Sequence, residues 1–147
     1  MLSGKPACGK TTLIRDVARC LTDKKIKTCV IDESNEIAAY SFGETGFELG
    51  AVCDVISNCA KATASEIALR TMSPDVIIFD EIGFTDCETM HKISYAGVKV
   101  IASFHCFSDT GNSFILEKLK QYGFFATLLK MDKIGEMPKF DYSYVNC

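Results

Sequence analysis

The chain has 147 residues, of which 48% are hydrophobic and 24% are charged, and it contains only 3 Pro. This composition is close to the globular average and excludes a disordered or collagen-like chain, so we expect a single domain covering residues 1–147. The formal net charge is −3, whereas a dedicated nucleic-acid-binding protein usually carries a basic face, so we expect no nucleic-acid partner.

Helix and strand patterns alternate along the chain. Apolar residues at three-and-four spacing predict helices at Lys10 to Leu21, Lys61 to Met72, Asp86 to Ala96 and Ser113 to Tyr122. Short apolar runs predict strands at Ile26 to Asp32, Asp75 to Asp80, Lys99 to Phe104 and Phe124 to Met131. The tail indicates a terminal hairpin, and residues 33–51 have no clear assignment. Such alternation is typical of an α/β fold with a mostly parallel central sheet flanked by helices in three layers.

Membrane and disulfide features are weak in this sequence. No uncharged apolar stretch approaches the roughly 18 residues of a membrane span, and the first residues show no signal-peptide pattern, so we expect a cytoplasmic protein. The 8 Cys include no CxxC pair. In a cytosolic chain they are best interpreted as small buried hydrophobic side chains, with structural zinc as the alternative.

The first residues carry a phosphate-binding pattern. Gly4 to Thr11 (GKPACGKT) match GxxxxGK[ST], in which backbone N–H groups and a helix N-terminus surround an anion. We expect Lys10 to reach the β- and γ-phosphates and the Thr11 hydroxyl to hold Mg²⁺. The residues expected to contact the nucleotide are Gly4, Lys5, Pro6, Ala7, Cys8, Gly9, Lys10, Thr11 and Thr12.

A buried strand normally leads into such a loop. Here Met1, Leu2 and Ser3 alone precede it. We therefore expect a truncated first strand and a chain that is a fragment of a longer protein.

Two acids follow the apolar run from Val76 to Phe79. In phosphate-loop enzymes an Asp at such a strand end holds Mg²⁺, and an adjacent Glu can deprotonate the attacking water. We therefore predict that Asp80 is a metal ligand and Glu81 a catalytic base, which favours a hydrolase over a passive nucleotide binder. The alternative is a pair of solvated acids at a strand terminus.

Further polar side chains follow other predicted strands. His105 comes directly after the strand from Lys99 to Phe104, at the edge where ligands bind in open parallel sheets. It is a candidate γ-phosphate sensor, and the alternative is a structural hydrogen bond. Asp32, Glu33 and Glu36 follow an earlier strand, and they either face the site or form a solvated turn.

At these residues the chain resembles the stage III sporulation protein AA ATPases, which are related to pilus and type IV secretion motor ATPases. The specific segments are the Met72-Ser73-Pro74 strand entry and Asp80-Glu81-Ile82-Gly83, whereas the phosphate loop by itself is not specific to this family. The resemblance implies a RecA-like P-loop core that hydrolyses ATP with Mg²⁺ and assembles as a homo-oligomeric ring. It also implies membrane-associated sporulation channel proteins as partners, a location at the inner face of a membrane, and an N-terminal domain outside this chain.

The chain departs from that family pattern at three arginines, which are replaced by Ser34, Val52 and Phe84. Arginine contacts a transferring phosphoryl group in many such enzymes. Arg70 remains, and we expect it to be a phosphate-directed or intersubunit catalytic residue. The alternatives are a degenerate, non-hydrolysing ATP-binding subunit and a small-molecule kinase. A kinase is disfavoured because kinase lids carry several Arg and no Arg follows position 70.

Overall fold

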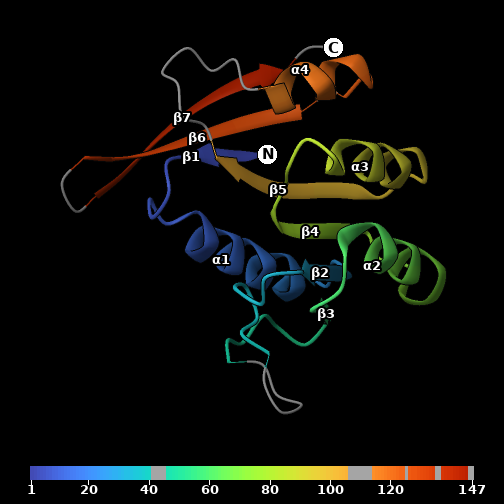
Figure 1. The fold of residues 1–147 in the computed structure, drawn as a ribbon. Helices are drawn as coiled ribbons and strands as arrows, with labels where there is room; N and C mark the ends of the chain where they lie inside the picture. Colours follow the sequence, from blue (N-terminus) through green and yellow to red (C-terminus); the bar gives the residue numbers. More distant parts are fainter. Residues whose placement is uncertain (41–45, 106–113, 125, 135–136, 146–147) are drawn as a thin grey trace.

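The computed structural model describes residues 1–40, 46–105, 114–124, 126–134 and 137–145. Within them, seven strands form one sheet in the order β3-β2-β4-β5-β1-β6-β7, which runs from bottom to top in Figure 1. Neighbouring strands are parallel except for the antiparallel pair β6 and β7. The strands are Leu2–Gly4 (β1), Thr28–Asp32 (β2), Cys53–Ser57 (β3), Val76–Glu81 (β4), Lys99–His105 (β5), Ala126–Ile134 (β6) and Met137–Val145 (β7).

Helices cover both faces of the sheet, so the molecule has three layers (Figure 1). They are Lys10–Asp23 (α1), Lys61–Ile67 (α2), Asp86–Tyr95 (α3) and Phe114–Gln121 (α4), and a π-helical turn, Ala68–Met72 (η1), continues α2. Helix α1 packs on one face, and α2, α3 and α4 pack on the other. The predicted α/β class with a mostly parallel, helix-flanked sheet is confirmed.

Strand β4 shows why the sheet is buried on both sides. Val76 and Ile78 point to the α1 face and pack in one cluster with Ile14. Ile77 and Phe79 point to the opposite face and pack in a second cluster that includes Met90 of α3. Side chains alternate between faces along a strand, so a central parallel strand covered on both faces needs an unbroken apolar sequence.

The structure differs from the predicted elements in several places. Strand β3 was not predicted, because it is a short, half-buried edge strand that contains Asp54. Strand β6 runs three residues beyond the predicted end at Met131, because its antiparallel pairing with β7 extends to Ile134. The hairpin expected in the tail is formed by these two strands. Ser113, the predicted start of α4, lies outside the described residues.

The described cysteines are free. Cys8, Cys29 and Cys87 are buried and Cys20 is exposed, while Cys106 and Cys147 lie outside the described residues. Burial raises the pKa of the Cys29 thiol to about 12, with smaller contributions from Asp54 and Cys53. Such thiols behave as hydrophobic side chains. In the described part of the chain, no helix combines the length and apolar character that a bilayer crossing requires.

Candidate functional site: a phosphate loop facing strand-end acids

The phosphate loop connects β1, in the middle of the sheet, to the first turn of α1. Ala7 and Gly9 have φ angles of 58° and 98°, in the left-handed region. Such turns direct successive N–H groups toward one point and form an anion-binding concavity at the positive end of the helix. A Cβ on Gly4 would lie 2.5 Å from the Met131 carbonyl oxygen. Glycine is therefore required at position 4 for the loop to pack against β6.

Lys10 is the buried cation of the loop. Its side chain folds back over the loop, where Nζ donates hydrogen bonds to the carbonyl oxygens of Gly4 at 3.0 Å and Lys5 at 2.8 Å. The same Nζ lies 3.2 Å from Nδ1 of His105. The ammonium is thus held beside the concavity in which phosphate oxygens would bind.

Asp80 and Glu81 reach the site through an irregularity in β4. In the pairing of β4 with β5, Phe79 lies opposite Ala102 and Glu81 lies opposite Ser103, so Asp80 is an extra residue. Consecutive residues of a regular strand point to opposite faces, whereas a bulge redirects one of them. As a result, both carboxylates line the same pocket.

The Asp80 carboxylate is buried and surrounded by donors. Oδ1 accepts the backbone N–H of Glu81 at 2.7 Å and Oδ2 accepts that of Ser34 at 3.0 Å. Lys61 Nζ lies 3.3 Å from Oδ1 and 2.6 Å from Oε2 of Glu33. Burial lowers the pKa of Lys61, but its bonds to Glu33 and Asp80 outweigh burial and raise it, so the ammonium stays charged.

Glu81 is linked to the phosphate loop through His105. Oε2 of Glu81 lies 3.0 Å from Nε2 of His105, and the other ring nitrogen faces Lys10. His105 ends β5, between β4 and β1 in the sheet. The order of the parallel strands therefore places the His105 side chain between Glu81, the predicted base, and Lys10, the predicted phosphate-binding lysine.

These residues enclose a pocket of about 460 Å³. It is lined by Pro6, Ala7, Gly9, Lys10, Thr11, Thr12, Glu36, Asp80, Glu81, Ser103 and His105. A concavity of N–H groups with a buried ammonium fits a polyphosphate. The Thr11 hydroxyl and the Asp80 carboxylate supply the oxygen ligands that Mg²⁺ prefers, so the donor set fits both groups.

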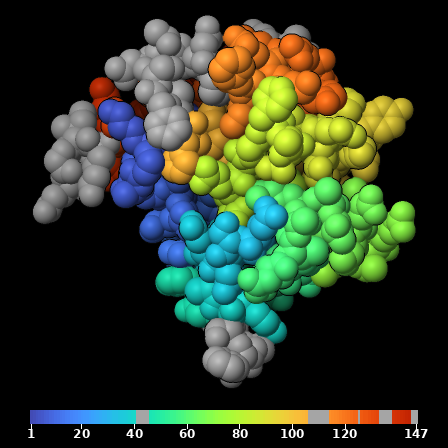
Figure 2. Space-filling model, viewed as in Figure 1, coloured from blue at the N-terminus to red at the C-terminus, as the bar shows by residue number. Residues whose placement is uncertain are grey.

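Asp32, at the end of β2, and Glu36, in the turn that follows, have different roles. Asp32 is fully buried and accepts the backbone N–H groups of Glu36, Ile37 and Ala38 at 2.8 to 3.0 Å. It orders the turn and does not face the pocket, whereas Glu36 lines the pocket. Arg15 of α1 donates to the carbonyl oxygens of Glu36 and Ile37. In Figure 2 the segment after β2 accordingly lies against α1.

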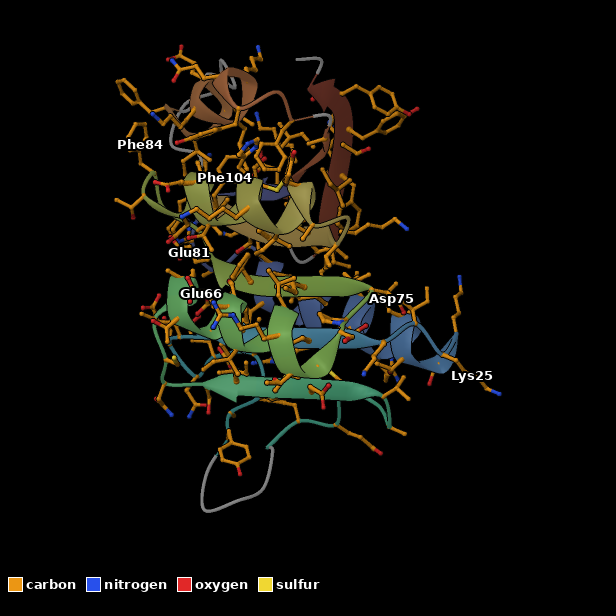
Figure 3. The ribbon with its side chains drawn as sticks, turned by 90° about the vertical axis from the view of Figure 1, so that its right-hand side faces the viewer. Lys25, Glu66, Asp75, Glu81, Phe84 and Phe104 are labelled. Carbon is orange, nitrogen blue, oxygen red and sulfur yellow. The ribbon has the colours of Figure 1, made fainter. Side chains whose placement is uncertain are left out.

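Other predicted residues are not brought to the pocket. Arg70 is exposed in η1, close to the entry into β4, and this is the end of the sheet opposite the phosphate loop. Figure 3 shows the two ends of β4, with Glu81 at one and Asp75 at the other. Val52 precedes the start of β3 and lies at the same far end as Asp75. A phosphate-directed role of Arg70 within its own pocket is therefore not supported, and an intersubunit role stays a prediction.

Phe84 lies at the same end as Glu81 but beside α4, where Lys118 Nζ is 5.0 Å from the ring centroid (Figure 3). Ser34 does contact the site, through its N–H bond to Asp80.

Sequence reasoning missed the role of Lys61. One signal was available, because a lysine at the first position of a helix opposes the helix dipole and needs a compensating acid.

Solved structures with a similar fold are P-loop ATPases. The VirB11 ATPase of the Brucella suis type IV secretion system, in complex with sulphate, aligns with a TM-score of 0.68 and 16% identity, over 97% of this chain and 47% of that chain. The Legionella pneumophila ATPase DotB aligns with a TM-score of 0.63 and 16% identity, over 97% of this chain and 43% of that chain. At these identities the likeness shows the fold alone.

Sequence relatives are more specific. Stage III sporulation protein AA of Bacillus subtilis (strain 168) is 41% identical over 114 residues, which are 74% of this chain and 37% of that protein. The uncharacterized protein ycf45 of Porphyra purpurea is 35% identical over 113 residues, 71% of this chain and 19% of that protein. The chain thus spans less than half the length of these relatives. Residues 1–144 match the family model described as sporulation stage III, protein AA, and the chain belongs to this family.

Proposed function

We propose that this chain binds ATP with Mg²⁺ and hydrolyses it, as one subunit of a ring-shaped motor in a sporulation channel assembly. The observation that carries this proposal is the line of contacts from Lys10 through His105 to Glu81, which joins the phosphate loop to the strand-end acids in one pocket. The name of the Bacillus subtilis relative and the description of the family support a sporulation role, and the ATPase fold supports nucleotide chemistry.

Each side chain has a distinct task in this proposal. The loop N–H groups and Lys10 bind the β- and γ-phosphates. Thr11 and Asp80 would hold Mg²⁺, which would supply positive charge to the phosphate oxygens. A water oxygen bonds to the γ-phosphorus while the bond from that phosphorus to the bridging oxygen of ADP breaks. Glu81 accepts the proton of the water. His105 orients the Glu81 carboxylate and senses the γ-phosphate through its contact with Lys10.

The test is Glu81→Gln, which keeps the shape of the side chain but removes its basicity. We expect ATP to bind with nearly unchanged affinity while phosphate release slows about a hundredfold or more. Phosphate release and binding of a labelled ATP analogue measure the two effects. Lys10→Ala serves as the binding control, because loss of the ammonium should abolish binding of Mg·ATP.

Two alternatives have distinct outcomes in this experiment. A degenerate subunit would bind ATP without hydrolysing it, and Glu81→Gln would then change nothing. Because Glu36 lines the same pocket, Glu36→Gln is the matched variant. A hundredfold loss in Glu36→Gln with normal turnover in Glu81→Gln would assign the base to Glu36.

A further inference from the structure

A second pocket lies beside the phosphate loop, on the side away from the strand-end acids. Its volume is about 380 Å³, and it lies between the start of α1 and the β6–β7 hairpin. Ala7, Gly9 and Thr12 line both this pocket and the phosphate pocket. The two cavities therefore adjoin across the loop, and one ligand can extend from one into the other.

The lining of the second pocket is mainly apolar. Leu13 of α1 forms one wall, while Met131 of β6 and Pro138 and Phe140 of β7 form the other. Phe140 is opposite Met131 in the antiparallel register, and the Met131 side chain reaches the loop near Gly9. Phe140 is 47% exposed. The Phe140 ring is thus partly exposed on β7, which β6 alone separates from β1 and the phosphate loop.

We propose that this pocket holds the base of the nucleotide, stacked on Phe140. The inference rests on the proposed function, because it takes the phosphates to lie in the adjoining pocket. On the opposite side of the loop the phosphate pocket is bounded by Asp80, Glu81 and His105, which suit charged groups and water. The flat, apolar faces of a purine match the side lined by Leu13 and Phe140. Stacking of a base on an aromatic ring contributes about 1–3 kcal/mol, or roughly 5- to 150-fold in affinity.

The test separates the base from the phosphates by comparing ATP with inorganic triphosphate as Mg²⁺ complexes. In Phe140→Ala we expect ATP affinity to fall about tenfold or more, while triphosphate affinity stays within about twofold. Phe140→Tyr keeps a stacking ring and should bind ATP like the parent. Tyr144→Ala is the matched control, because Tyr144 lies on the same face of β7, is 70% exposed and is outside the pocket lining.

The outcomes distinguish the two proposals. If the parent binds neither ATP nor triphosphate, the proposed function fails and this inference fails with it. If the parent binds both with equal affinity, or Phe140→Ala weakens both equally, nucleotide binding stands and the base pocket is overturned. A loss of ATP affinity in Phe140→Tyr as large as in Phe140→Ala would also overturn it. Thermal melting of each variant verifies that it is folded.

Discussion

Lys61 places a positive charge beside the predicted metal ligand. Its side chain is 8% exposed and that of Asp80 is 4% exposed, so both charges are largely removed from water. Removing one partner of a buried ion pair strands the other charge in a poorly solvated position. Because Lys61 also bonds to Glu33, it connects the turn after β2 to the end of β4. We interpret it as a positioning residue that compensates Asp80.

We expect Lys61→Met to lower the free energy of unfolding by about 3 kcal/mol, the lower end of the range for a broken buried pair. Added Mg²⁺ should then raise the melting temperature of the variant more than that of the parent, because the cation replaces the lost ammonium beside Asp80. Thermal melting with and without Mg²⁺, in the absence of nucleotide, measures both effects.

Lys92→Met is the control for Lys61→Met. Lys92 pairs with Glu88 at 2.9 Å on the surface of α3, where both side chains are more than half exposed. Exposed pairs contribute little to stability, so this variant should melt close to the parent with or without Mg²⁺. Equal Mg²⁺ responses in Lys61→Met and the parent would refute the compensating role.

Directly after β2, the described residues 33–40 form no helix or strand, and a buried carboxylate orders them. Asp32 accepts three successive backbone N–H groups, and the turn that it fixes carries Ile37 and Ala38 into the core. The same turn places the Ser34 N–H on Asp80 and Glu36 in the pocket. An element without regular structure thus supplies one side of the site.

Asp32→Ala should therefore affect both stability and binding. Hydrogen bonds to a charged acceptor contribute about 1.5–3 kcal/mol each, so we expect the free energy of unfolding to fall by about 3 kcal/mol or more. Affinity for Mg·ATP should fall as well, because the turn no longer holds Ser34 and Glu36. Denaturant unfolding and nucleotide titration measure these effects.

Asp75→Ala is the matched control for Asp32→Ala. Asp75 also accepts a backbone N–H, that of Lys27 at 3.0 Å, but the bond is exposed and lies at the opposite end of the sheet (Figure 3). This variant should lose little stability and no nucleotide affinity. If it weakened Mg·ATP binding as much as Asp32→Ala, the effect would be general and not due to the turn.

The whole molecule determines which of the three positions where the family resemblance implies an arginine lies at this site. Among these positions, Ser34 contacts Asp80, Phe84 lies beside Lys118, and Val52 is at the far end of the sheet. Because the Ser34 backbone contacts Asp80, we predict that an arginine side chain at position 34 reaches the γ-phosphoryl group, whereas one at position 84 would face the Lys118 ammonium.

We predict that Ser34→Arg raises turnover about tenfold or more while ATP affinity stays within about twofold. The contact would act mainly in the transition state, where an arginine of this type raises the hydrolysis rate by about 10³-fold or more. Val52→Arg adds the same charge away from the pocket and should not raise turnover within one subunit. Measuring rate against protein concentration separates a contact within the chain from one between ring neighbours. No change in Ser34→Arg would show that the replaced arginine was not catalytic.

The sequence by itself determined the fold class and the main chemical groups of the candidate site. The glycine spacing of the loop, the apolar run of β4 and the acids after it are local patterns, because each reflects the backbone geometry or burial of adjacent residues. Strand β3 was missed because a short edge strand lacks a strong apolar pattern. The alternation of helices and strands was sufficient for the parallel sheet.

Only the tertiary structure decided which side chains meet. Lys61 and Asp80 come from different elements, and neither the strand order nor the bulge at Asp80 can be read from local periodicity. The same holds for the pocket between α1 and Phe140, which exists because β6 lies beside β1. Contacts between residues distant in sequence depend on the packing of the whole chain, whereas local patterns depend on the period of a single helix or strand.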